Sequence, residues 1–157
     1  MDSLNYKEFI IPLKISKVRK VKSPERATSG SVGIDFYIPE EFPYTWIKPQ
    51  ERILIPSGIK VNVPEGFGLI ANNKSGIANK YGLIFGSSVV DNDYEGEVHI
   101  SLINTSNEIV RIGPNQKIIQ FLLIPLPPVF IIETDEKELF LDKDSQRKSG
   151  GFGSTGE

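Results

Sequence analysis

Residues 86–97 read GSSVVDNDYEGE. The apolar pair Val89 and Val90 is typical of a buried strand, and its burial would fix the neighbouring carboxylate of Asp91 in one orientation, as a general base requires. The residues that follow are equally typical of a hairpin turn, because Asp and Asn side chains hydrogen-bond their own backbone. Taken alone, the stretch is most simply a turn that carries two acids, and the rest of the chain has to decide between a turn and a site.

Alternation of apolar and polar residues predicts that the chain around this stretch is all-β. Residues 59–63 and 98–102 alternate strictly, which predicts strands with one buried face. Many short strands separated by turn sequences, such as Pro-Glu-Gly at 64–66, favour a sandwich, a jelly roll or a barrel. Further β-type runs are expected at residues 9–15, 52–55, 67–70, 118–124 and 129–132.

Composition excludes several classes of site. The 157 residues fit one domain, and a hydrophobic fraction of 39% is enough for a packed core. The chain has no cysteine, which excludes disulfides, thiolate metal sites and cysteine nucleophiles. Its single histidine, His99, falls on the polar side of an alternating strand and receives no catalytic role. A net charge of -2 argues against a broad nucleic-acid surface but allows a small anionic ligand.

No apolar run in the sequence reaches the length of a transmembrane helix, and the first residues lack the layout of a signal peptide. We therefore expect an intracellular soluble protein without membrane partners. It would be cytoplasmic, or located in a host cell if the source is viral.

Three internal segments carry polar groups at positions where a site could form. Asp35 begins an apolar strand after a loop of small residues. This context is compatible with a metal-facing carboxylate and equally with an acid in a turn. Residues 75–81 look helical, with Ser75 as the cap and Gly82 as the end. Lys74 and the free N–H groups of that helix start suit an anion, although an ordinary serine cap worth about 1 kcal/mol explains the same residues. Gln120 interrupts an apolar strand, so its amide needs a partner.

The composition changes after residue 141, and we expect a β-rich domain over residues 1–141 and a flexible arm over residues 142–157. Glycine-rich backbone, hydroxyls and cations can surround phosphates, and an exposed aromatic ring can stack on a base. The arm contains all of these groups, although it lacks the spacing of a P-loop. They are Arg147, Lys148, Ser149, Phe152, Ser154 and Thr155.

Five segments, taken in order, resemble the five motifs of the trimeric deoxyuridine triphosphatases (dUTPases). The resemblance implies a jelly-roll subunit in a homotrimer, with the C-terminal tail exchanged between subunits and each active site built from all three. It implies hydrolysis of dUTP to dUMP and pyrophosphate with Mg²⁺ on the triphosphate, which keeps uracil out of DNA and supplies dUMP for dTMP synthesis. The segments are residues 31–37, 74–78, 86–97, 117–121 and 147–156.

The resemblance also implies a role for individual residues. Asp91 would deprotonate the attacking water, Asp35 would hold Mg²⁺ through water, and Gln120 would contact the phosphates and the attacking water. Tyr94 would pack on the deoxyribose and leave no space for a 2′-hydroxyl. The uracil edge would be read by backbone groups of residues 86–89, and Phe152 would stack on the base. The implied substrate-binding positions are Lys74, Ser75, Gly76, Gly86, Ser87, Ser88, Val89, Tyr94, Arg147, Phe152, Gly153, Ser154 and Thr155.

Several positions depart from the family pattern. Lys74 stands where arginine is usual, which replaces a bidentate phosphate contact by a point charge. Ser88 and Lys148 stand where glycine is common, and so does Asn115, which tolerates the left-handed conformation. Two other functions stay open: a dCTP deaminase-like or bifunctional nucleotide enzyme, and a jelly-roll trimer that binds or regulates without catalysis. A regulatory protein partner beside the enzymatic activity also stays open.

Overall fold

The computed structural model describes residues 10–141. Ten strands and one helix lie within this range. In chain order they are β1 (Lys14–Lys17), β2 (Ile34–Tyr37), β3 (Thr45–Ile47), β4 (Arg52–Asn62), β5 (Phe67–Asn72), α1 (Ser75–Tyr81), β6 (Leu83–Phe85), β7 (Val89–Val90), β8 (Glu97–Asn104), β9 (Val110–Ile112) and β10 (Lys117–Pro125).

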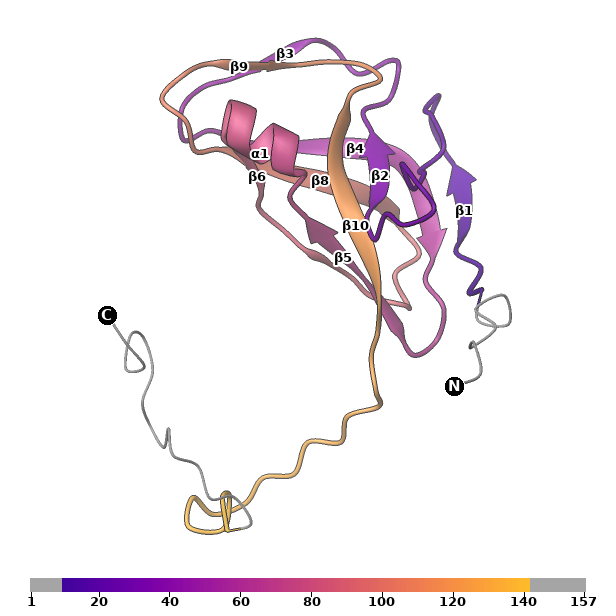
Figure 1. Ribbon diagram of the computed structural model, residues 1–157, viewed down its shortest axis with the longest axis vertical. Coiled ribbons are helices and arrows are strands. Elements are labelled where there is room, and N and C mark those ends of the chain that lie inside the picture. Colours follow the sequence, from indigo (N-terminus) through magenta and orange to yellow (C-terminus); the bar gives the residue numbers. More distant parts are fainter. Residues whose placement is uncertain (1–9, 142–157) are drawn as a thin grey trace. The chain divides into compact units, whose positions relative to one another are not determined.

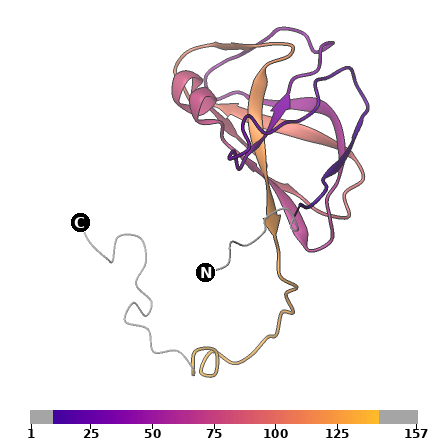
Figure 2. The same ribbon diagram turned by 45° about the vertical axis from the view of Figure 1, so that its right-hand side comes forward.

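Two four-stranded antiparallel sheets form the body of the fold. One has the strand order β1-β4-β8-β6 and the other has the order β2-β10-β5-β7, while β3 and β9 form a separate pair. Figure 1 shows β10 running along the front of the molecule between β2 and β5. Figures 1 and 2 both place α1 at the end of the molecule where β3 and β9 pair. The predicted all-β, jelly-roll-like class with one short helix is confirmed for the described residues.

The core lies between the sheets and follows the alternation in the sequence. Ile59 and Val61 of β4 and Val98, Ile100 and Leu102 of β8 are all buried. Because successive side chains of a strand point to opposite faces, this period of two places one face of each strand in the core. Burial of such a side chain is worth about 1.5–3 kcal/mol, so the core holds both sheets in register.

The helix spans Ser75–Tyr81, which confirms the predicted range, but its cap differs from the prediction. Lys74 is its cap residue and makes no side-chain capping bond, so the prediction that Ser75 caps the helix is wrong. The carbonyl of Lys74 accepts the N–H groups of Ile77 and Ala78, at 2.9 Å each, which makes Ser75 the first helical residue. Gly82 ends the helix in the left-handed conformation (φ 65°), as predicted, because it lacks a Cβ.

Two predicted strands differ from the structure. The N-terminal strand begins at Lys14 rather than at the start of the 9–15 run, and residues 129–132 form no strand among the described residues. Residues 129–132 have high β-propensity, but a strand also needs a neighbour to accept its backbone hydrogen bonds, and none is described for this segment. Asn115 does adopt the left-handed conformation (φ 62°), as predicted.

The chain divides into two compact units between Pro127 and Pro128. Of the second unit the structure describes residues 128–141, where backbone hydrogen bonds from Glu138 to Asp135 (2.9 Å) and from Leu141 to Glu138 (3.4 Å) form turns. The arm predicted over residues 142–157 lies outside the described residues, and its boundary stays a prediction.

Across residues 10–141, the structure has no helix that is both long enough and apolar enough to span a membrane.

Candidate active site

Asp35 is a buried charged residue on β2, the edge strand of its sheet. Only 2% of its surface is exposed. Its backbone is fixed on both sides, since Asp35 pairs with Gln120 of β10 and exchanges two backbone hydrogen bonds with Glu25, of 2.8 and 3.2 Å. A buried carboxylate is stable only when other groups compensate its charge. Asp35 is therefore not the exposed turn acid that its sequence context also allowed.

Two ammonium groups compensate this carboxylate. Lys74 Nζ donates a hydrogen bond of 2.8 Å to Asp35 Oδ1. Lys117 Nζ lies 3.4 Å from Asp35 Oδ2, as an ion pair. Oδ2 itself accepts no hydrogen bond among the described residues, although it is buried. Oδ1 thus accepts one hydrogen bond, whereas Oδ2 has an ion-pair partner but accepts no hydrogen bond within the described residues.

Lys117 is in turn held by a second acid. Its Nζ lies 2.8 Å from Glu25 Oε1, which also accepts a 2.5 Å hydrogen bond from the hydroxyl of Tyr37. Hydrogen bonding from Lys117 and Tyr37 lowers the pKa of Glu25, and the bond to Glu25 raises the pKa of Lys117. Burial, together with the bond to Glu25, raises the pKa of Tyr37. These groups and the pair formed by Asp35 and Lys74 make one continuous ionic cluster.

The amide of Gln120 is fixed beside this cluster. Its Nε2 donates a 2.7 Å hydrogen bond to the carbonyl of Asn73, so the partner that its sequence context required is backbone. Its Oε1 lies directly over Gly33, where a Cβ would overlap the amide. Gly33 was not singled out from the sequence, and its place among small residues ahead of Asp35 was the signal for it. Ser75 and Gly76 lie exposed beside Lys74 at the start of α1.

Residues 86–90, which include the backbone that the resemblance assigns to reading the uracil edge, connect the two sheets and form no hairpin. Strand β6 pairs with β8 in one sheet, and β7 pairs with β5 in the other. The N–H of Gly86 donates to the carbonyl of Ser101 (2.9 Å), and the N–H of Ala71 donates to the carbonyl of Ser88 (2.6 Å). Val89 is 62% exposed, so the prediction that it is buried beside Asp91 is wrong. A two-residue edge strand covers only one face of each residue, and here Val90 takes the inner one.

Asp91 lies exposed in a turn at the end of β7. The N–H of Tyr94 donates to the Asp91 carbonyl (3.3 Å), which confirms the predicted turn. Asp91 also lines a small hollow of about 220 Å³ together with Phe67, Val89 and Leu126. The turn therefore presents its carboxylate outward and next to apolar atoms.

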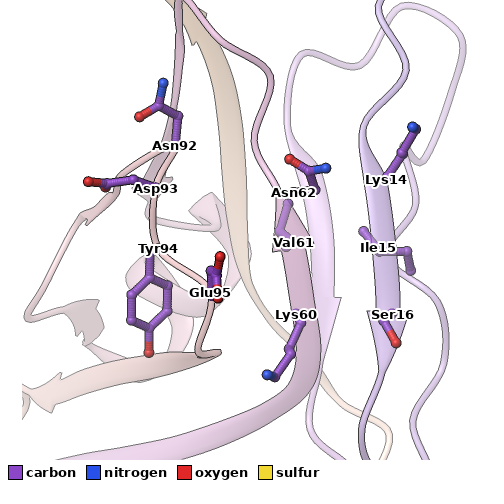
Figure 3. A pocket seen from close by; sticks show the side chains of 10 residues that line it. All are labelled: Lys14, Ile15, Ser16, Lys60, Val61, Asn62, Asn92, Asp93, Tyr94 and Glu95. Atoms are coloured by element: carbon purple, nitrogen blue, oxygen red, sulfur yellow. The ribbon is translucent and has the colours of Figure 1, made fainter.

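Tyr94 lines a larger groove of about 480 Å³. Figure 3 shows the turn residues 92–95 on one side of this groove and residues of β1 and β4 on the other. The hydroxyl of Tyr94 donates to the carbonyl of Glu97 (3.0 Å), and its ring lies over Gly96, where a Cβ would overlap it. Two lysines in this groove, Lys14 and Lys60, were not singled out from the sequence, since lysines on polar strand faces are common.

Glu97 anchors the end of the same segment. It accepts two hydrogen bonds from Arg19, of 2.7 and 3.2 Å, and one of 2.7 Å from the N–H of Gly58. Burial pushes the pKa of Glu97 up, but the bonds from Arg19 and Gly58 outweigh it and leave the pKa lowered. His99 is exposed, as predicted, and contacts the Glu97 carbonyl (2.9 Å). Glu97 is therefore a structural acid.

The two candidate carboxylates are far apart within one chain. Asp35 and β7 lie at opposite edges of their sheet, separated by three strand spacings of about 4.8 Å each. Asp35 pairs with Gln120, and Gln120 pairs with Asn72, whereas the last residue of β7, just before Asp91, pairs with Leu69. Asp91 therefore lies about four residues further along the sheet than Asp35, an offset of about 14 Å at about 3.4 Å per residue, which puts the backbones of the two acids roughly 20 Å apart.

The described residues contain no cluster of three or more acids or histidines that would enclose a metal ion. Mg²⁺ does not need one, because it keeps several waters and is often bound by one or two carboxylates together with substrate phosphates. Oδ2 of Asp35 accepts no hydrogen bond within the described residues, so it has acceptor capacity for one such contact through water, but it is buried and pairs with Lys117 at 3.4 Å. Lys74, which occupies Oδ1, is the competing partner.

The remaining predicted site residues, Arg147, Phe152, Gly153, Ser154 and Thr155, lie outside the described residues.

Comparison with known proteins gives one consistent result. The dUTPase family model matches residues 19–156. The deoxyuridine 5′-triphosphate nucleotidohydrolase of Fusobacterium nucleatum is 34% identical over 149 residues, which cover 94% of this chain and 98% of that protein. The dUTPase of Staphylococcus bacteriophage 80alpha with dUpNHpp has a similar fold, with a TM-score of 0.79, 22% identity and coverage of 93% of this chain and 99% of that one. A variant dUTPase of phage phi11 of S. aureus, described as revealing the coordination of a structural Mg(II) ion, has a TM-score of 0.71 at 20% identity, covering 80% of this chain and 98% of that one.

Proposed function

This chain belongs to the dUTPase family, and we propose that it hydrolyses dUTP to dUMP and pyrophosphate by attack of water on the α-phosphorus. Phosphoryl transfer of this kind depends on positioning and on neutralising charge more than on covalent catalysis. A chain without cysteine and with one exposed histidine supplies what that reaction needs, namely carboxylates, cations and an amide.

The carboxylate separation supports a site made by more than one copy of the chain. Asp35 and Asp91 lie roughly 20 Å apart in one chain, too far to act on one phosphorus atom. In a homotrimer the cluster around Asp35 on one subunit would face the turn around Asp91 on the next. The exchanged tail, with Arg147 and Phe152, would close the site from a third subunit. We propose this arrangement as the functional assembly.

Asp91 takes the proton of the attacking water while that oxygen bonds to the α-phosphorus and pyrophosphate leaves. Its exposed place at the end of a turn lets a bound water reach the carboxylate. Gln120 orients the water or a phosphate oxygen, since its amide is held by Asn73 and Gly33. Tyr94 packs on the deoxyribose, and the backbone of residues 86–89 reads the uracil edge.

Lys74 and Ser75 contact the triphosphate at the start of α1, near the buried carboxylate of Asp35. Asp35 would hold Mg²⁺ through a water on Oδ2, beside the ion pair that this oxygen forms with Lys117. When bound, the ion would neutralise charge on the phosphate oxygens. The single observation that carries the proposal is the cluster of a compensated buried acid on β2, a fixed amide on the adjacent β10 and the Lys74 ammonium just before α1.

Pyrophosphate release from dUTP, dCTP, dTTP and UTP at equal concentration tests the proposal. We expect release from dUTP alone, because a site that pairs with the uracil edge rejects cytosine, and packing on the sugar rejects the 2′-hydroxyl. Equal release from UTP and dUTP would contradict the role of Tyr94. Deamination of dCTP would favour the deaminase-like alternative, and no release from any nucleotide would favour a binding protein.

A further inference from the structure

The two lysines beside Asp35 are held in different ways. Lys74 Nζ makes its only hydrogen bond in the described structure to Asp35 Oδ1, and its side chain is 29% exposed. Lys117 Nζ lies between Asp35 (3.4 Å) and Glu25 (2.8 Å) and also faces the ring of Tyr37, at 5.5 Å from its centroid. Lys74 thus has a single contact to give up, whereas Lys117 has three.

The proposed function, on which this inference rests, takes Lys74 away from Asp35. A triphosphate carries several negative charges, and an ammonium that binds it cannot keep its full contact with a buried carboxylate. Removal of one partner from a buried ion pair leaves an uncompensated charge and is strongly unfavourable. The step is feasible only if another cation stays close to Asp35. The proposed Mg²⁺ would be separated from the carboxylate by water, whereas Lys117 already pairs with it directly at 3.4 Å.

We propose that Lys117 is a positioning residue that stays with the carboxylate of Asp35 and keeps it compensated and oriented when Lys74 turns to the triphosphate. Its anchor is part of the same sheet edge, because Glu25 and Asp35 pair through two backbone hydrogen bonds. The hydroxyl of Tyr37 donates to the same Glu25 oxygen that Lys117 contacts, which holds this carboxylate in place. Lys117 itself touches neither the nucleotide nor the reacting atoms.

The proposal predicts an effect confined to ligands that carry the β- and γ-phosphates. In Lys117→Met, affinity for the imido analogue of dUTP should fall about 10- to 100-fold, as is typical when an outer partner of a binding group is removed. Affinity for dUMP, which lacks those phosphates, should stay within about twofold of wild type, because Lys74 then stays with Asp35. Lys117→Arg should restore most of the loss, since it keeps the charge.

Isothermal titration calorimetry of the full-length chain measures the affinity for each ligand. Thermal unfolding of the same variants checks that they are folded. Lys20→Met is the matched control, because Lys20 forms a 2.7 Å ion pair with Glu40 on the surface, with 81% of its side chain exposed. Unchanged affinity of Lys117→Met for the analogue overturns the proposal. Equal loss for dUMP and the analogue also overturns it, because a structural role would produce that result.

Glu25→Gln provides a second variant if Lys117→Met does not fold. It leaves Lys117 charged but removes its 2.8 Å anchor, so it should weaken analogue binding and spare dUMP in the same pattern. A wild-type affinity for both ligands would overturn the proposal. A wild-type chain that binds the analogue without releasing pyrophosphate from dUTP would instead count against the proposed function.

Discussion

Asp35 and Asp91 show two opposite ways of placing a carboxylate. Asp35 lies in a strand, is 2% exposed and has two ammonium partners. Asp91 lies in an exposed turn after a two-residue edge strand, and its carboxylate forms no hydrogen bond or ion pair within residues 10–141. A buried carboxylate needs partners within the chain to compensate its charge. The exposed carboxylate of Asp91 needs none, so its surroundings are left to solvent, a ligand or another copy of the chain.

The difference assigns different tasks to the two regions. The cluster around Asp35 is completed by the fold itself, since β2, β10 and the residue before α1 bring its members together. The turn around Asp91 is fixed at its ends by β7 and by Glu97, but its carboxylate faces outward. In the proposed trimer, the first region is therefore complete within one chain, whereas the second becomes a site only when another copy covers it.

Replacement of Asp91 should have the largest effect. Asp91→Asn removes the group that takes the proton from water, so turnover of dUTP should fall by about 10²- to 10⁴-fold while dUMP binding is retained. Steady-state pyrophosphate release and calorimetry measure the two quantities. Asp93→Asn is the matched control, because it makes the same chemical change two residues away in the same exposed turn. A near-normal rate for Asp91→Asn would remove Asp91 as the base.

Mixing two inactive variants tests whether the two carboxylates act from different copies. If the chain assembles as proposed, Asp35→Asn and Asp91→Asn, unfolded together and refolded, should recover about one quarter of wild-type activity, because a site that takes each group from a different subunit is intact with that frequency. Recovered pyrophosphate release is the measurement. No recovery, from variants that each refold into trimers, would mean that both carboxylates come from one chain.

Sequence reasoning succeeded where a feature depends on local pattern. Alternation around Val61 and Ile100 gave the strands and their buried faces, and Gly82 marked the end of the helix. Resemblance of the motifs identified Asp35 and Gln120 as neighbours in function, and the structure places them opposite each other on adjacent strands.

It failed where a feature depends on partners that are distant in the sequence. Nothing local indicates that Lys74 would pair with Asp35, 39 residues away, or that Gly33 would lie under Gln120. Val89 looked buried because periodicity shows which residues share a face, but not whether anything covers that face. Turn composition predicted the turn after β7, but it does not specify which strands pair, so the crossing between the two sheets at residues 86–88 had no signal in the sequence.

A methyl group at residue 33 should produce an intermediate effect. In Gly33→Ala the new Cβ would overlap Gln120 Oε1, so the amide must move from its place beside Asp35. A displacement of about 1 Å in a positioning group can cost up to about 10²-fold in kcat. Gly30→Ala is the matched control, because a Cβ there meets nothing within 4 Å. Equal kcat values for the two variants would show that the position of the Gln120 amide does not matter.

The smallest expected effect concerns the anchor of the exposed turn and is one of stability. The folded chain lowers the pKa of Glu97 below its ordinary value of 4.5, so its ionised form stabilises the fold above that pH, and the contribution disappears as pH falls through the lowered pKa. Glu97→Gln should therefore reduce the free energy of unfolding by about 1–2 kcal/mol at pH 7, through the lost charged hydrogen bonds to Arg19 and Gly58.

Urea unfolding at pH 7 and at pH 3 measures this difference, with the exposed Glu40→Gln, which also loses an ion pair, as the matched control. The gap between wild type and Glu97→Gln should narrow at the lower pH, while the gap for Glu40→Gln should be small at both. A gap for Glu97→Gln that is the same at both pH values would mean that the side chain acts by packing alone. The turn around Asp91 would then be held by the pairing of β7 with β5 and of β8 with β4, rather than by charge.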